Sequence, residues 1–219
     1  MGVALLARAA RAPGVPPAVA LSFADFVAQQ QVSFAAHMQD PADGLFFHGY
    51  NAFTNETSCC KWGRANGWVL MSHAEVALTL ASVAPQHPLL PRVHDIWRAH
   101  AEGMRKSQAA DGRWHQVLTE PTTYLETSVT NMALYSLVDG VEAGVLDRAT
   151  FAPVIEGAWA GGAAQVQADG TVSGICAGTG IGSDVAFYQA RPTDYADSDP
   201  GIGSVWRAAL AYDRFGHAN

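Results

Sequence analysis

The chain has 219 residues, of which 49% are hydrophobic, and its formal net charge is −7 at pH 7. A chain of this length and composition buries a sizeable core in one or two domains, and it has no apolar run long enough to span a membrane. Its 13 lysines and arginines stand against 20 aspartates and glutamates. That balance argues against nucleic acid and anionic membranes as partners, because both require a basic surface.

The cysteines and the start of the chain narrow the classes of protein to which this chain can belong. Cys59, Cys60 and Cys176 have neither the spacing of a disulfide framework nor that of a zinc site, so we expect free thiols, no metal and no cofactor. Residues 18–20 resemble a signal-peptide cleavage site, but arginines interrupt the apolar region before it. We therefore expect no signal peptide and favour a cytoplasmic location.

The helices are expected in the following order. Residues 1–11 are rich in alanine and leucine, and a proline-rich segment ends this first helix. Ser22 is the expected N-cap of a second helix, which runs to Met38. The later helices are expected at 69–83 and 124–141, apolar on most sides, at 91–104 and 151–166, apolar on one side, and at 203–215.

Asp-Gly turns begin at Asp43, Asp111 and Asp169, 68 and 58 residues apart, and each is followed by a short extended segment. The unit of amphipathic helix, turn and buried helix therefore repeats. Alternating inner and outer helices with every turn at the same end predict an all-α fold, a toroid whose turn-side loops converge on one funnel. We expect a single domain over residues 1–219.

Trp62–Trp68 combines two indoles, a guanidinium, an amide and two glycines, and we expect it to be a binding loop. An arginine fork matches a carboxylate, and an indole offers a flat apolar face to a sugar ring. In the alternative interpretation both tryptophans are core residues and Arg64 pairs with an acid. The funnel would bring together His48, Arg64, Trp68, His115 and Gln116.

Six stretches, taken in order, resemble a known family: Gly44–Tyr50, Trp62–Val69, Asp111–Val117, Tyr124–Ser128, Asp169–Val172 and Gly178–Gly182. The family is the unsaturated glucuronyl and rhamnogalacturonyl hydrolases, in particular glycoside hydrolase family 105. One departure is Ala65, where the family usually has glycine. The resemblance implies an (α/α)6 barrel of six-hairpin glycosidase type, truncated here to about seven helices and incomplete at the N-terminus.

The resemblance also implies an activity on Δ4,5-unsaturated galacturonyl or glucuronyl residues of rhamnogalacturonan (pectin) oligosaccharides. In the family an aspartate protonates the vinyl ether and activates water, and the resulting hemiketal collapses to release the neighbouring sugar. Met1-Gly2 resembles the end of the motif that carries this aspartate, which would precede Met1. We therefore expect impaired activity.

By the same resemblance His48 is the expected catalytic residue, assisting the acid or the water. Arg64 would hold the uronate carboxylate, Trp68 would stack on the ring, and Asn66, His115 and Gln116 would complete the substrate-binding set. His48 and His115 are also compatible with structural roles, and Glu126 with a cap or a site residue. An unsaturated uronyl oligosaccharide is the expected partner, and a noncatalytic sugar-binding remnant is the alternative function. Exposed apolar flanks at residues 1–10 and on the last helix predict self-association.

Overall fold

The computed structural model describes residues 2–193 and 199–217, which form eight helices and two short antiparallel sheets. None of these helices is long and apolar enough to cross a membrane. The helices are α1 (Gly2–Ala10), α2 (Pro17–Met38), α3 (Gly63–Val83), α4 (Leu90–Ser107), α5 (Thr127–Glu142), α6 (Arg148–Ala163), α7 (Val185–Gln189) and α8 (Asp199–His217). The strands are β1 (Tyr50–Asn51) paired with β2 (Glu56–Thr57), and β3 (Trp114–His115) paired with β4 (Leu125–Glu126).

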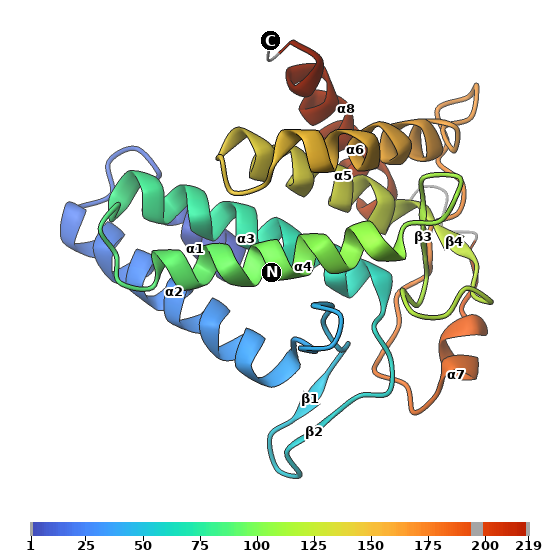
Figure 1. Ribbon diagram of the computed structural model, residues 1–219, viewed down its shortest axis with the longest axis horizontal. Coiled ribbons are helices and arrows are strands. Elements are labelled where there is room, and N and C mark those ends of the chain that lie inside the picture. The colour runs from blue at the N-terminus through green and yellow to red at the C-terminus, as the bar shows by residue number, and fades with distance from the viewer. Residues whose placement is uncertain (1, 194–198, 218–219) are drawn as a thin grey trace.

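The long helices form two layers, as the repeat predicted (Figure 1). The inner helices α1, α3, α5 and α8 pack side by side in that order, and the outer helices α2, α4 and α6 cover them. Nearly every residue of α5 is buried, whereas α4 buries one face only. The short α7 was not predicted, because a helix of five residues leaves too little periodicity to detect.

All three Asp-Gly turns have the predicted local geometry. In each turn an aspartate Oδ1 accepts a hydrogen bond of 3.0 Å from the N–H two residues later, and the glycine has a φ between 79° and 87°. A β-carbon on Gly44 would lie 2.2 Å from the Ala99 carbonyl oxygen of α4, and one on Gly112 would lie 2.0 Å from the Gly157 oxygen of α6. The first two turns therefore dock against the backbone of the next outer helix.

Three sequence predictions are corrected here. The second helix begins at Pro17 and not after Ser22, because proline fits the first turn of a helix, where its missing N–H has no intrahelical acceptor. Cys59 and Cys60 were expected to be free thiols, but a disulfide bond joins them, and Cys176 is the free cysteine among the described residues. The last helix begins at Asp199, four residues earlier than expected.

The inner helices are joined by buried charges. Glu75 on α3 accepts hydrogen bonds from Arg8 and Arg11 of α1 and from the Tyr135 hydroxyl of α5. Asp139 on α5 accepts from Arg214 of α8 at 2.7 Å. Burial raises the pKa of Asp139 to about 6 even though Arg214 opposes the shift.

The raised pKa of Asp139 makes stability depend on pH. In the unfolded chain this carboxyl ionises near pH 4, whereas in the fold it stays protonated to about pH 6. The stability of the folded state relative to the unfolded chain is therefore greatest below pH 4 and falls as the pH rises to about 6. Chemical denaturation of the wild type and Asp139→Asn should show the variant gaining up to about 3 kcal/mol relative to the wild type between pH 4 and pH 7. Asp213→Asn, at an exposed position, should show no such trend. A difference that stays flat across this range contradicts the assignment.

Apolar side chains on the first and last inner helices are exposed, as predicted. Leu5 on α1 is 70% exposed, and Trp206 and Leu210 on α8 are 67% and 62% exposed. Self-association through these flanks stays a prediction. Sedimentation velocity should show concentration-dependent association that Leu210→Glu reduces and that Phe53→Ser, on the exposed hairpin, leaves unchanged. A monodisperse wild-type monomer with a cooperative thermal transition would contradict it.

Candidate functional site

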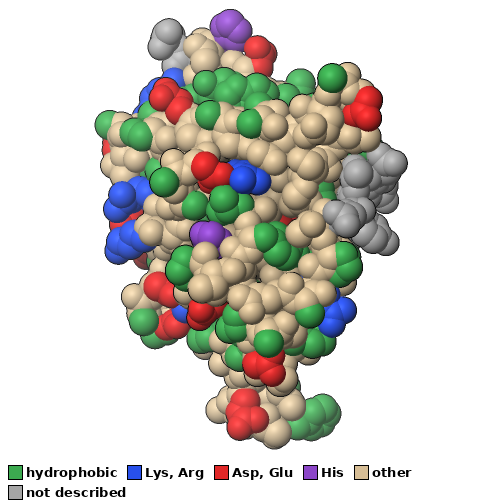
Figure 2. All heavy atoms as spheres, turned by 90° about the vertical axis from the view of Figure 1, so that its right-hand side faces the viewer, with side chains coloured by type: hydrophobic (Ala, Val, Ile, Leu, Met, Phe, Trp, Pro, Cys, Tyr) green, Lys and Arg blue, Asp and Glu red, His purple; other side chains and the backbone are tan. Residues whose placement is uncertain are grey.

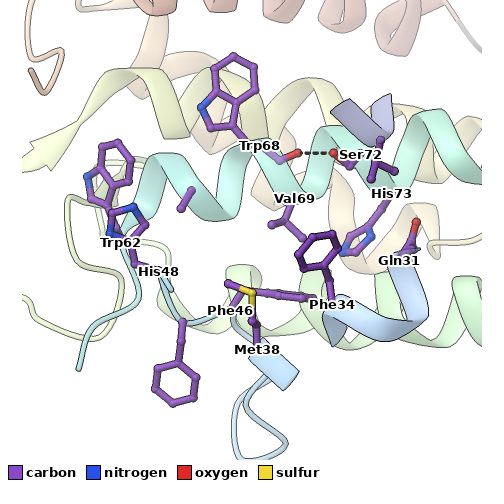
Figure 3. Close-up of a pocket in the computed structure, with 13 residues that line it drawn as sticks. Gln31, Phe34, Met38, Phe46, His48, Trp62, Trp68, Val69, Ser72 and His73 are labelled. Atoms are coloured by element: carbon purple, nitrogen blue, oxygen red, sulfur yellow. Dashed lines mark hydrogen bonds between the residues drawn. The ribbon is translucent and has the colours of Figure 1, made fainter. Parts of the chain in front are cut away.

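A groove of about 360 Å³ lies between α1, α2 and α3 and the segment that leads into β1. Trp62 and His48 mark one end, and His73 and Gln31 mark the other (Figure 3). Apolar side chains line the middle, among them Phe34, Met38, Phe46 and Val69. Such a concavity, apolar with a few polar groups, is typical of a small-molecule site.

Trp62–Trp68, which we expected to be a loop, is helical from Gly63 onward. The two glycines serve close packing here. A β-carbon on Gly63 would lie 2.9 Å from the His115 oxygen, and one on Gly67 would lie 2.8 Å from Met132 Sδ. The stretch is therefore the first turn of an inner helix, pressed against the β3 hairpin and α5. Trp68 consequently projects from a rigid helix and lines the groove.

Asn66 faces away from the groove and fixes its edge. Its amide accepts from the Phe46 N–H at 2.8 Å and donates to the Phe46 and Trp62 carbonyls at 2.9 and 3.0 Å. The side chain is fully buried, so the structure uses it to hold the segment before His48. We had expected it to touch substrate.

Arg64 also uses its hydrogen-bond donors within the protein. The residue is 3% exposed, and its guanidinium donates to the Cys176 and Ala177 carbonyls at 2.7 and 3.1 Å. Its Nη1 lies 3.9 Å from the Glu126 carboxylate, which agrees with the alternative interpretation of an arginine paired with an acid. The group expected to hold a uronate carboxylate is therefore not among the residues that line the groove.

Glu126 is the N-cap of α5, which decides between the roles left open for it. Its fully buried carboxylate accepts from the Val129 N–H, the Ser128 hydroxyl and the Cys176 N–H at 2.8 to 3.0 Å. Glu126 and Arg64 thus bind the same peptide segment, one through its N–H and the other through its carbonyls. This segment leads into the glycine-rich loop at 178–182.

His48 is the titratable side chain at the rim of the groove. Its Nδ1 lies 2.8 Å from the Tyr188 hydroxyl, and its ring packs on Trp62 with centroids 4.7 Å apart. Burial lowers the pKa of His48, so the imidazole is neutral at pH 7. Because Tyr188 occupies Nδ1, the other ring nitrogen is left for a ligand. Sequence reasoning missed Tyr188, which comes 140 residues later.

His115 and Gln116 lie beside the groove without lining it. His115 Nδ1 is 2.5 Å from the Thr123 carbonyl, and the buried Gln116 donates to the Tyr188 carbonyl at 2.7 Å. Of the predicted site residues, His48 and Trp68 therefore share the groove. Arg64, Asn66, His115 and Gln116 support its surroundings.

The far end of the groove has a polar atom that sequence reasoning did not find. His100 Nε2 donates to Asn66 Oδ1 at 3.0 Å, so the neutral His100 accepts at Nδ1 from His73 Nε2, 3.2 Å away. Burial lowers the pKa of both histidines, that of His73 to about 3. His73 Nδ1 is then a buried acceptor without a partner among the described residues. It can accept a ligand hydroxyl at the groove.

Imidazole, indole, amide and hydroxyl groups supply the polar atoms of the groove. None of the described residues that line it carries a carboxyl group, and the described part of the chain has no cluster of three metal-ligating side chains. On the face shown in Figure 2, basic and acidic side chains are scattered and form no basic stripe. Two indoles and two neutral imidazoles suit a ring with hydroxyl groups.

Comparison with known proteins gives consistent results. The profile of the family described as Glycosyl Hydrolase Family 88 matches residues 1–215. The unsaturated rhamnogalacturonyl hydrolase YesR of Bacillus subtilis is 30% identical over 157 residues, which are 71% of this chain and 42% of YesR. An unsaturated 3S-rhamnoglycuronyl hydrolase of Alteromonas is 30% identical over 60% of this chain and 32% of its own length.

A solved structure from Salmonella enterica, described as a possible member of the GH105 family, matches with a TM-score of 0.83 at 23% identity. The match covers 89% of this chain and 51% of that one, so the chain spans about half the length of the relatives it matches. The likeness confirms the α/α toroid predicted from the repeat. With its fold and almost its whole length matched, the chain belongs to glycosyl hydrolase family 88, a family of hydrolases.

Proposed function

We propose that the chain binds the unsaturated uronyl end of a pectin-type oligosaccharide, in the groove between His48 and Trp68. The observation that carries the proposal is the joint placement of these two residues, from separate parts of the chain, on one concavity. Family membership supports the ligand class, since the relatives' names specify unsaturated rhamnogalacturonyl and rhamnoglycuronyl substrates.

Each end of the groove has a part in this proposal. The Trp68 indole offers an apolar face on which a sugar ring stacks. His48, oriented by Tyr188 and Trp62, uses its free ring nitrogen to hydrogen-bond a ring hydroxyl or the attacking water. Neutral His73 accepts a hydroxyl at the other end. Because these groups are held by buried contacts, the ligand meets a preformed surface.

The reaction that the family resemblance implies is hydration of the vinyl ether: a proton adds to the double bond, water adds to the resulting cation and gives up a proton, and the hemiketal opens to release the next sugar. A neutral His48 is a poor acid for the first step, because its lowered pKa leaves little imidazolium at pH 7. With no carboxyl group among the described residues of the groove, we expect this chain to bind far better than it catalyses. That same observation favours a noncatalytic sugar-binding role as the second candidate.

Binding is tested with an unsaturated rhamnogalacturonan disaccharide. Isothermal titration should give a saturable signal, and Trp68→Leu should weaken it roughly tenfold because the stacking surface is lost. Trp206→Leu is the matched control, since Trp206 is exposed on α8 and does not line the groove. Equal affinities for the wild type and Trp68→Leu would reject this groove as the site.

Catalysis is tested by following the loss of absorbance of the conjugated double bond. We expect turnover roughly a hundred- to ten-thousand-fold slower than that of a full-length relative, the range attributable to one positioned acid. His48→Ala should lower what remains. Turnover equal to that of the relative would contradict the binding-only role and indicate an acid elsewhere in the chain.

A further inference from the structure

Beyond the groove, the inner face of the toroid has a hollow of about 160 Å³ between α3, α5 and α8. Arg207 of α8 lines it, and also lines a neighbouring hollow of about 180 Å³ beside α1. Trp68 lines both hollows and the groove. A ligand stacked on Trp68 therefore lies next to the hollow that Arg207 lines.

Arg207 is a cation without a carboxylate partner in the described part of the chain. It makes no ion pair or hydrogen bond there, and its guanidinium lies 5.2 Å from the centroid of the Tyr135 ring. The nearby arginines are engaged: Arg8 and Arg11 with Glu75, and Arg214 with Asp139. Since Glu75 already has two arginine partners, the charge of Arg207 is left for something in the hollow.

The rest of the hollow also favours an anion. Asn131 lines it, and its amide nitrogen is buried without a partner among the described residues. Ser204 also lines it, with its hydroxyl donated to the Gly201 carbonyl at 2.9 Å, and no carboxylate is among the described residues that line it. An unpaired guanidinium beside an unused N–H donor matches the oxygen atoms of a carboxylate or a sulfate.

We infer that Arg207 and Asn131 form a subsite for an anionic group on the sugar that is bonded to the unsaturated uronyl residue. The placement of this sugar rests on the proposed function, because it assumes that the uronyl ring stacks on Trp68. The subsite selects oligosaccharides whose second sugar carries a carboxylate or a sulfate ester. Arg207 is thus a specificity residue, distinct from the groups at the rim.

The subsite itself is tested with inorganic sulfate at constant ionic strength, by following the Trp68 indole N–H resonance in NMR spectra. The wild type should show a saturable shift, Arg207→Gln should weaken it at least tenfold, and Arg207→Lys should retain part of it. Arg92→Gln is the matched control, because it removes the same charge from an exposed position on α4. A shift that is absent, or equal in wild type and Arg207→Gln, would overturn the inference.

Three disaccharides then identify the anion and separate this inference from the proposed function. Unsaturated disaccharides with a uronate or a sulfated second sugar should each bind more tightly than the one with a neutral second sugar, and Arg207→Gln should abolish the difference. The anionic disaccharide whose affinity falls more in Arg207→Gln carries the group that the subsite prefers. If all three bind the wild type equally well, the subsite is refuted and the proposed function stands. If sulfate binds but none of the disaccharides does, the proposed function fails and the anion site stands.

Discussion

The site depends on one buried contact between segments that are far apart in the chain. Arg64 binds the Cys176 and Ala177 carbonyls, and Glu126 binds the Cys176 N–H. The start of α3, the start of α5 and the segment before the glycine-rich loop are thereby held together. A buried carboxylate and guanidinium are tolerated here because each is hydrogen-bonded to backbone as well as facing the other charge. Removing either group would leave the other unsatisfied in the interior.

This contact also explains how His48 is positioned. The loop beyond Ala177 reaches Tyr188, whose hydroxyl accepts from the Gly182 N–H at 3.1 Å and contacts His48. Asn66 holds the other side of His48 through the Phe46 backbone. The imidazole is therefore fixed from two directions by Tyr188 and Asn66, which do not line the groove, and precise placement of a functional group requires such support. The buried, structural position of Arg64 and the position of His48 at the rim of the groove are parts of one arrangement.

The elements set by local chemistry could be predicted from the sequence. The Asp-Gly turns follow from the aspartate side chain and from the freedom of glycine at positive φ. The buried helices α3 and α5 follow from their apolar composition. The start of α3 was mistaken for a loop because Gly63 and Gly67 were interpreted as turn formers, whereas they allow close packing against His115 and Met132. The role of these glycines in packing is visible only when the neighbouring chain segments are seen in the structure.

The roles of polar residues were harder to predict for the same reason. Backbone carbonyls are the hydrogen-bond acceptors of Arg64, Asn66 and Gln116. Because every residue has a carbonyl group, the sequence does not show which carbonyl a side chain will bind. Among the predicted site residues, His48 and Trp68 line the groove. Both are partly buried, and an imidazole or an indole has few uses apart from packing or binding. Arg207 was not identified, because the sequence shows eleven arginines alike and only the structure distinguishes those that are paired.

The distribution of these pairs makes an acidic chain compatible with the acidic ligand proposed above. Its net charge of −7 repels anions at long range, but this repulsion is screened within about 10 Å at 0.1 M salt. Recognition therefore depends on local charge, and on the inner face each carboxylate in the described contacts is matched by arginine. Glu75 has two such partners and Asp139 has one. With the carboxylates neutralised, the remaining guanidinium determines the local potential beside Trp68, and the lumen can be cationic inside an acidic protein.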